Sequence, residues 1–311
     1  MSYFGLSFER GQVSPVAGRP LKQSLDEALA SVPPSAPVTV LIHGFKFQPG
    51  IVGRDPHQLL FARKPACAHW KIISWPRALG FDGDPRTGLA IGFGWEASPE
   101  GPTPVHRFRA ACRAAEDAGH GLADLLDLIA RLAPQRRPQI FAHSLGAAVA
   151  LRGLAHASPS TTGPSLLLGA AAFAREAQDC LTARPQTAPI LNVTSRKNAP
   201  YDHLFSAFAP TTHLKRRTLA QGLGAAHPAW VDLALEAPCL PERLAAHGHH
   251  LAPSGPGICH WSFYRRGGVM AFYADLLRRP KYWTPARQRA LTDTAPAAHT
   301  HPGARWGLTG A

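Results

Sequence analysis

The chain has 311 residues and a formal net charge of +13, because 33 lysines and arginines stand against 20 aspartates and glutamates. Hydrophobic residues make up 45% of it, which excludes a disordered chain and suffices for one large folded domain. No stretch approaches the roughly 18 consecutive apolar residues of a transmembrane helix, and the N-terminus lacks the basic start and apolar run of a secretory signal. We therefore predict a cytoplasmic protein without a transmembrane segment.

The positive charge is spread along the sequence. Arginine supplies 26 of the 33 cations, and the densest clusters are pairs such as Arg136-Arg137 and Arg265-Arg266. A basic surface can bind nucleic acid or anionic ligands, but no nucleic-acid motif accompanies these pairs. The five cysteines are scattered without a C-x-x-C pair, which favours reduced thiols. We do not expect nucleic-acid binding to be the main role.

Strands and helices are predicted to alternate through the middle of the chain. Apolar runs predict strands at residues 38–42, 71–75, 139–142, 165–172 and 190–194. Apolar residues at three- and four-residue steps, or runs of small residues, predict helices from 104 to Pro134, at 147–157, shortly after 172 and at 269–277. Residues 76–104 are rich in Gly and Pro and are expected to be irregular. This alternation predicts an α/β fold with a mostly parallel central sheet flanked by helices on both faces.

The domain boundaries follow from the same reading. We expect residues 1–35 to be an N-terminal extension that packs on the domain, 36–280 to be the domain, and 281–311 to be a weakly ordered C-terminal tail. About 17 residues separate the strand that ends near residue 172 from the next strand. That length leaves no room for a large cap domain.

The segment Ala142-His143-Ser144-Leu145-Gly146 joins a predicted strand to a predicted helix of small residues. A serine at such a junction lies on a tight, strained turn that raises its hydroxyl above the sheet. Small neighbours are needed there because the helix packs close to the strand. We predict that Ser144 is a nucleophile; the alternative is that it only caps the helix.

This segment resembles the G-x-S-x-G nucleophile elbow of the α/β-hydrolase superfamily, with Ala142 in the position of the first glycine. His43-Gly44, after an earlier strand, and the Ile73-Ser74-Trp75-Pro76 segment are similar too, so the resemblance covers about residues 36–280. The resemblance is strongest in the elbow and in His43-Gly44. The similar proteins are esterase- and lipase-like serine hydrolases, including a branch of small bacterial proteins with an Ala-His-Ser-Met/Leu-Gly elbow. The resemblance implies a catalytic triad in the order Ser, acid, His, but no particular substrate.

The resemblance also implies an oxyanion hole. Its two donors would be the backbone N–H groups of Phe45 and Leu145, aimed at the developing oxyanion. His43 and His143 each precede a turn residue, so we expect them to be structural and not catalytic.

A serine nucleophile needs an imidazole to take its proton. His260 is the predicted base, because it lies in the loop before the last predicted helix. The cluster of His247, His249 and His250 is the alternative. No metal ligation is expected there, because no Cys or carboxylate stands at a recognised spacing.

The acid is harder to place. It should follow the strand at 190–194, where Asn198 or Ala199 stands nearest to the usual position of an aspartate. The first carboxylate available is Asp202, which we choose; its alternative role is in the first turn of a helix. Asp232 is the runner-up. Asn198 could orient an imidazole but could not stabilise its positive charge as a carboxylate does.

The predicted function is hydrolysis of a carboxylic ester, a thioester or a lactone through an acyl-enzyme on Ser144. No cofactor or metal is expected, the partner is a small-molecule ester, and the oligomeric state is open. Two alternatives stand: a non-catalytic binding protein of the same fold, favoured by the weak acid position, and a basic-surface binder of nucleic acid or anionic ligands. The residues expected to line the substrate site are Phe47, Trp75, Phe93 and Trp95.

Overall fold

The computed structural model describes residues 2–158, 161–184, 188–210 and 217–292. Its centre is an eight-stranded sheet in the order β2-β1-β4-β3-β5-β6-β7-β8, in which every neighbouring pair is parallel except β1 and β2. The strands are β1 (Tyr3–Glu9), β2 (Gln12–Pro15), β3 (Val38–Ile42), β4 (Leu89–Trp95), β5 (Gln139–His143), β6 (Ser165–Leu168), β7 (Ile190–Thr194) and β8 (Trp230–Ala234). The predicted α/β class with a mostly parallel sheet is confirmed.

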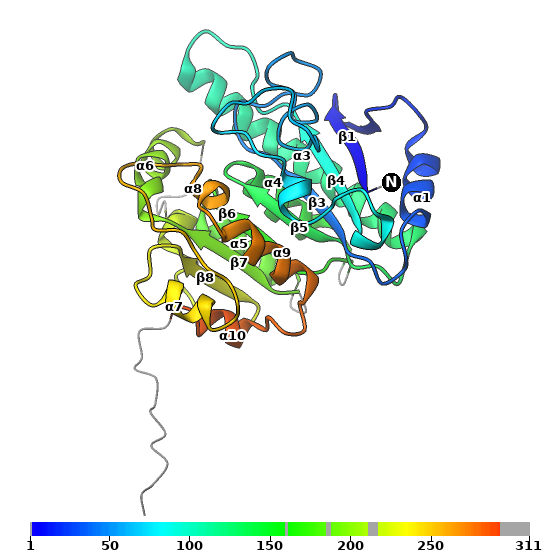
Figure 1. Cartoon of the computed structure of the whole chain (residues 1–311). Helices are drawn as coiled ribbons and strands as arrows, with labels where there is room; N and C mark the ends of the chain where they lie inside the picture. The colour runs from blue at the N-terminus through cyan, green and yellow to red at the C-terminus, as the bar shows by residue number, and fades with distance from the viewer. Residues whose placement is uncertain (1, 159–160, 185–187, 211–216, 293–311) are drawn as a thin grey trace, which may run out of the picture.

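Helices cover both faces of this sheet (Figure 1). Because successive strand residues point to opposite faces, Val40 and Ile42 of β3 belong to one apolar layer and Leu41 to the other. The first layer packs against α1, α3, α4 and α5, and the second against α2, α7, α8 and α9. The helices are α1 (Leu21–Ala30), α2 (Trp75–Ala78), α3 (Pro104–Leu132), α4 (Gly146–His156), α5 (Ala174–Ala183), α6 (Ala199–Phe208), α7 (Leu240–Ala245), α8 (Ser262–Arg265), α9 (Val269–Arg278) and α10 (Pro285–Arg289).

Most of the predicted elements in the middle of the chain are present, with two corrections. The strand predicted at residues 71–75 is wrong, because Ser74 instead accepts a hydrogen bond of 3.3 Å from the Arg77 N–H and caps α2. The strand predicted at 165–172 ends at Leu168, because Gly169 has a φ of +53° and turns the chain out of the sheet.

Strand β4 lies inside the segment that was expected to be irregular, and it runs between β1 and β3. Because two of its seven residues are glycines, the strand lacks the continuous apolar pattern by which a strand is predicted from sequence. A Cβ on Gly92 would lie 2.5 Å from the Tyr3 hydroxyl oxygen, and one on Gly94 would lie 2.6 Å from Nε2 of His57. The two glycines are therefore needed because other side chains pack directly against the backbone of this strand.

The two ends of the described chain also differ from the expected extension and tail. Residues 3–15 supply β1 and β2, so this part of the N-terminal segment is integral to the sheet. Beyond residue 281, α10 packs beside β8, where Arg289 donates hydrogen bonds to the carbonyl oxygens of His227, Pro228 and Trp230. Residues 293–311 of the predicted tail lie outside the described residues.

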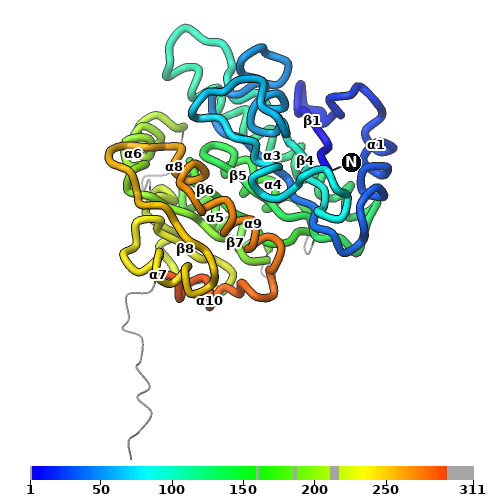
Figure 2. Tube along the Cα trace, viewed as in Figure 1, coloured from blue at the N-terminus to red at the C-terminus, as the bar shows by residue number. Residues whose placement is uncertain are grey.

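Two loops project together at the edge of the sheet where the site lies. The backbone N–H of Lys46 donates to the Ala97 carbonyl at 2.8 Å, and the Ala97 N–H donates to the Phe47 carbonyl at 3.0 Å. Figure 2 shows the two segments, in blue and blue-green, rising side by side at the top of the molecule. The loop after β3 is thereby held by the loop after β4.

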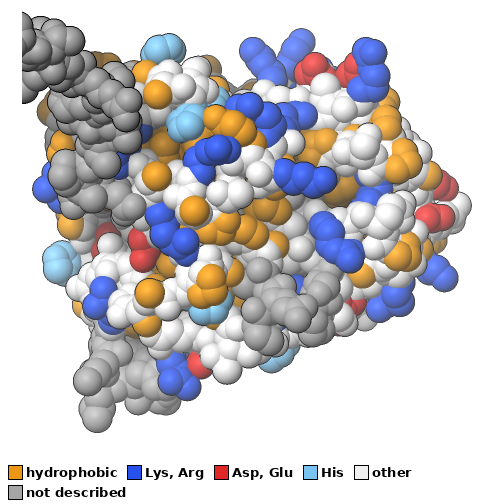
Figure 3. Space-filling view, turned by 90° about the horizontal axis from the view of Figure 1, so that it is seen from below, with side chains coloured by type: hydrophobic (Ala, Val, Ile, Leu, Met, Phe, Trp, Pro, Cys, Tyr) orange, Lys and Arg blue, Asp and Glu red, His pale blue; other side chains and the backbone are white. Residues whose placement is uncertain are grey.

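Cationic side chains are dispersed over the one face of the molecule that Figure 3 shows. On the face seen in Figure 3, lysine and arginine side chains are scattered between apolar ones, and acidic side chains are few. Within the described part of the chain, no helix is long and apolar enough to span a membrane.

Candidate active site

Ser144 lies on the turn between β5 and α4, with a φ of +56°. This left-handed conformation costs about 1–2 kcal/mol for an L-residue with a side chain, so the surrounding structure must hold it. The Ser144 N–H donates to the Leu168 carbonyl at 2.9 Å, which ties the turn to β6. Close packing also holds the turn in place, because a Cβ added to Gly146 would lie 2.5 Å from the His43 carbonyl oxygen. The predicted elbow geometry is therefore present.

The predicted oxyanion donors lie on either side of this turn. Gly44 approaches so closely that a Cβ there would lie 2.7 Å from the Ser144 Cβ, which brings the backbone after β3 beside the serine. Phe45 and Leu145 both line the same cavity as Ser144. Among the described residues, no acceptor is recorded for the N–H of Phe45 or of Leu145. Both N–H groups are thus available to an oxyanion.

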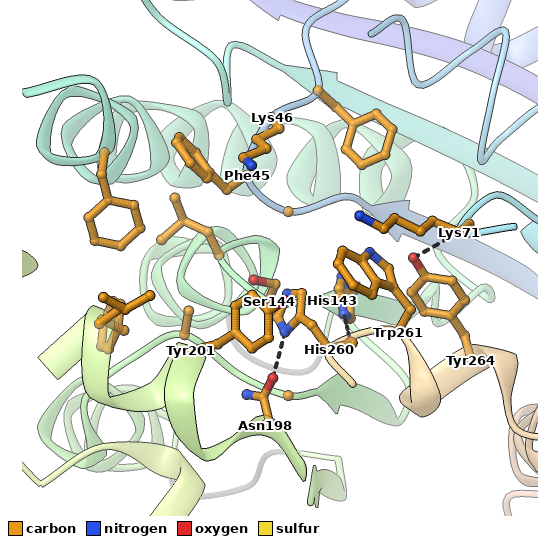
Figure 4. Close-up of a pocket in the computed structure, with 18 of the residues that line it drawn as sticks. Phe45, Lys46, Lys71, His143, Ser144, Asn198, Tyr201, His260, Trp261 and Tyr264 are labelled. Carbon is orange, nitrogen blue, oxygen red and sulfur yellow. Dashed lines mark hydrogen bonds between the residues drawn. The ribbon is translucent and has the colours of Figure 1, made fainter. Parts of the chain in front are cut away.

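His260 occupies the loop before α8 and lies beside Ser144 (Figure 4). Its Nδ1 lies 2.5 Å from Oδ1 of Asn198, and the Asn198 amide donates to Oδ1 of Asp202 at 2.7 Å. The ring also stacks on Tyr201, with centroids 4.5 Å apart and planes inclined by 26°. A hydrogen bond on one edge and a stacked ring on one face fix the orientation of the imidazole.

The expected position of the acid is corrected by this geometry. Asn198 contacts the imidazole, and Asp202 reaches it only through the Asn198 amide. The reason is helical spacing: Asp202 lies in the first turn of α6, four residues after Asn198, which is the residue before that helix. Asp232, the runner-up, accepts hydrogen bonds from Asn192 and Trp230, and so serves β7 and β8.

Burial shifts the pKa values of His260 and Asp202, the two titratable groups on either side of Asn198. Burial, together with the nearby His143, holds the pKa of His260 well below its usual 6.5. Burial raises the pKa of Asp202 to about 7, against the opposing effect of its hydrogen bond from Asn198. The imidazole is therefore neutral at pH 7, the form that can accept a proton, and the Asp202 carboxyl titrates in the physiological range.

His143 and His43 hold the backbone of the site, as expected of structural residues. His143 Nε2 lies 3.2 Å from the His260 carbonyl, and burial lowers its pKa to about 4. His43 is fully buried: its Nδ1 lies 2.9 Å from the Gly44 carbonyl, and its Nε2 accepts the Trp95 N–H at 3.1 Å. Burial lowers its pKa to about 3, so it is a neutral ring that braces the turn after β3.

Ser144 opens into a cavity of about 760 Å³. Phe47 lines it, as predicted, but Trp75, Phe93 and Trp95 are wrong as lining residues because each is 0% exposed in the core. Trp95 instead stacks on His43, with centroids 5.6 Å apart. Large aromatic residues in or beside a Gly- and Pro-rich segment were expected to line the substrate site. Strand β4, which was not predicted, instead carries Phe93 and Trp95 into the interior.

Other residues that line the cavity are not among those predicted from the sequence. Helix α6 contributes Tyr201 and Phe205, and the loop after β3 contributes Lys71. A weak signal was available, because Pro200 and Asp202 are typical of the first turn of a helix that would follow β7. The cluster of His247 and His249 lies elsewhere, bonded to Tyr282 and Asp275 respectively.

Comparisons with known proteins give distant likenesses. No protein-family model and no curated protein matches the chain. Among solved structures, a lipase-esterase related protein from Clostridium acetobutylicum is 9% identical with a TM-score of 0.35, covering 80% of this chain and 96% of that one. An acylaminoacyl peptidase from Pyrococcus horikoshii is 13% identical with a TM-score of 0.35, covering 79% of this chain and 37% of that one. At these values the likenesses say nothing about the activity of this chain.

Proposed function

We propose that this protein is a serine hydrolase that cleaves a carboxylic ester or thioester through an acyl-enzyme on Ser144. The observation that supports this most directly is the strained left-handed turn at Ser144, which opens into a cavity shared with His260 and with the backbone N–H groups of Phe45 and Leu145. Neither N–H group has an acceptor within the part of the chain that the structure describes. A helix cap or a packing residue would need neither the strain nor the neighbours. A cytoplasmic location stays a prediction from the sequence.

In the proposed reaction, Ser144 Oγ attacks the carbonyl carbon while its proton passes to Nε2 of His260. The Phe45 and Leu145 N–H groups stabilise the resulting oxyanion, and one such donor contributes about 3 kcal/mol. The bond to the leaving oxygen or sulfur then breaks, and His260 gives its proton to the leaving group. Water, deprotonated by the same imidazole, hydrolyses the acyl-enzyme and restores Ser144.

Asn198 takes the position of the triad acid in this proposal. Its Oδ1 accepts the Nδ1–H of His260, which holds the tautomer with a free Nε2. A neutral amide cannot stabilise imidazolium as a carboxylate does. Asp202 supplies such a charge behind Asn198 when it is ionised, above its pKa of about 7, and its hydrogen bond fixes which end of the amide faces the ring.

Labelling with a fluorophosphonate probe tests the proposal, with the adduct located by mass spectrometry of the Ser144 peptide. We expect labelling of the wild-type protein at pH 7.5 and none of Ser144→Ala. His260→Ala keeps the serine but loses its base, so its labelling rate should fall at least a hundredfold. A matched control is Ser98→Ala in the loop after β4, which should label normally.

The second candidate function is a non-catalytic binding protein, favoured by the amide in the position of the acid. It predicts no adduct on Ser144 and no turnover of a panel of phenyl esters with acyl chains of graded length. If the wild-type protein forms no adduct on Ser144 and hydrolyses none of these esters, the hydrolase proposal is wrong and the cavity serves binding alone.

A further inference from the structure

The cavity around Ser144 has two chemically different arms (Figure 4). One lies between α3 and α6 and is apolar. Phe108 stands edge-on to Phe45 with centroids 5.4 Å apart, and Phe108 and Phe205 are 6.3 Å apart. Val105 and Phe208 complete this arm. Such a surface accepts an alkyl or aryl chain, and the described residues of this arm offer no partner to a charged group.

The other arm lies beside His260 and carries a fixed cation. The Lys71 ammonium lies 3.8 Å from the centroid of the Trp261 ring and 5.1 Å from that of Trp70. The two indoles stand edge-on to each other at 5.2 Å. Tyr264 donates to the Lys71 carbonyl at 3.2 Å, which anchors the backbone of the lysine. This ammonium is held in place by aromatic faces, and within the described residues it has no carboxylate partner.

A second cation stands at the oxyanion side. Lys46 directly follows Phe45, and its φ of +78° makes it, with Ser144 and Arg10, one of three non-glycine residues in the left-handed region among those described. Figure 4 shows the ends of Lys46 and Lys71 on the side of the cavity opposite Asn198. The one carboxylate among the described lining residues is Asp202, which is bonded to Asn198. The described residues therefore do not neutralise the cationic charge in the cavity.

The chemistry of the proposed reaction assigns the two arms. The leaving group must lie next to His260, because this imidazole returns the proton to the leaving atom. Trp261 follows His260, so Lys71 stands on the leaving-group side, and the acyl chain is left with the apolar arm between α3 and α6.

We propose that the substrate is an ester or thioester of an apolar acid whose alcohol or thiol carries an anionic group, such as a phosphate or carboxylate, and that Lys71 and Lys46 bind this group. The inference rests on the proposed hydrolase function for the assignment of the two arms. It names a specificity determinant that the reaction by itself does not require.

Matched esters test where the charge is recognised. The anionic probe is 4-carboxyphenyl octanoate, and its neutral counterpart is 4-carbamoylphenyl octanoate, with the same chain and a similar leaving group. A third probe, the mono(4-carbamoylphenyl) ester of octanedioic acid, carries its charge at the acyl end. We expect kcat/KM to be about tenfold or more higher for the first than for the second, and lowest for the third.

Variants assign this preference to the lysines. Lys71→Met should reduce the anionic-to-neutral ratio of kcat/KM to near one, Lys46→Met should reduce it in part, and Lys71→Arg should retain much of it. Lys22→Met, at an exposed residue of α1 that does not line the cavity, is the control and should leave the ratio unchanged. An unchanged ratio in Lys71→Met overturns the assignment of that residue.

A binding measurement separates this inference from the hydrolase proposal. The amides 4-octanamidobenzoate and 4-octanamidobenzamide resist hydrolysis and are compared by calorimetry on the wild-type protein. Tighter binding of the benzoate that Lys71→Met abolishes, with no hydrolysis of any ester, would reject the hydrolase and keep the anion site. Hydrolysis of the esters with equal binding of both amides would keep the hydrolase and overturn the anion site.

Discussion

Oδ1 of Asn198 lies 2.5 Å from Nδ1 of His260, in the position where a serine hydrolase would ordinarily have a carboxylate. The same amide donates to Asp202 at 2.7 Å, so the carboxyl group, whose pKa burial raises to about 7, lies behind the neutral residue and not against the ring. Burial holds the pKa of His260 well below 6.5, and a neutral partner does little to raise it. The proposed base is thus kept neutral by its surroundings.

The order of these three groups predicts unequal effects of substitution. Asn198→Ala removes the partner of the ring and should lower kcat about a hundredfold, because the imidazole loses its orientation. Asp202→Asn leaves the Asn198 contact in place and should lower kcat by less than tenfold. Steady-state kinetics on one activated ester compare the two; a larger loss for Asp202→Asn would show that the distant charge, and not the contact, governs the rate.

Exchanging the two side chains is a sharper test. In the double variant Asn198→Asp with Asp202→Asn, a carboxylate contacts His260 directly and raises its pKa by about 1–3 units. The acid limb of kcat/KM should therefore move to higher pH relative to the wild-type protein, whose limb lies below 6.5 because burial lowers the pKa of His260. If the acid limb lies at the same pH in both proteins, the limb does not reflect the titration of His260.

Buried neutral imidazoles predict how stability depends on pH. Burial lowers the pKa of His43 to about 3 and that of His143 to about 4, while in the unfolded chain both return to about 6.5. The unfolded state then binds more protons below pH 6.5, so the free energy of unfolding should fall as pH drops from 6.5 towards 4. Each group contributes at most about 1.4 kcal/mol per pH unit.

Urea denaturation at several pH values measures this slope. His143→Gln keeps a donor for the His260 carbonyl but cannot titrate, so its slope should be smaller than that of the wild-type protein. His106→Gln, at the exposed start of α3, is the control and should not change it. A slope that His143→Gln leaves intact would place the titration elsewhere.

The backbone packing at the elbow makes its glycines irreplaceable. In Gly146→Ala the new methyl would lie 2.5 Å from the His43 carbonyl oxygen, which no side-chain movement relieves, so we expect a loss of about 1–3 kcal/mol and of activity. Gly255→Ala meets nothing within 4 Å and is the matched control, expected to change stability by less than about 0.5 kcal/mol. Thermal unfolding and ester hydrolysis report the two effects.

The left-handed turn predicts that stability and activity separate at Ser144. Ser144→Gly removes the strain at a φ of +56°, whereas Ser144→Ala keeps it, so the glycine variant should be more stable than the alanine variant by about 1 kcal/mol. Both should be inactive. In the helix that follows, Ala147→Gly should lose about 1 kcal/mol instead, because glycine is a poor helix former. If the order of the two Ser144 variants is reversed, the turn is not strained in solution.

The elements that carry a local signal could be predicted from the sequence. Apolar runs at β3, β5 and β7, the periodic helix α3 and the strand–Ser144–helix junction are set by nearest neighbours along the chain, and each is present in the structure. The place of His260 in a loop before a helix with a clear apolar face was predictable in the same way, while its role as base stays a prediction. A local pattern suffices where the physical cause, such as burial of alternate residues, is itself local.

The rest is decided by tertiary contacts. Gly92 and Gly94 make β4 look irregular, and only the packing of Tyr3 and His57 against them explains a strand there. Asn198, and not Asp202, contacts His260, because α6 begins at the residue after Asn198 and carries Asp202 further along the helix. The sequence composition does not show which of the two side chains meets the imidazole. The Lys71 ammonium and the apolar arm between α3 and α6 likewise come from segments that are distant in sequence, and only the fold brings them to one cavity. The total charge of +13 does not reveal this placement.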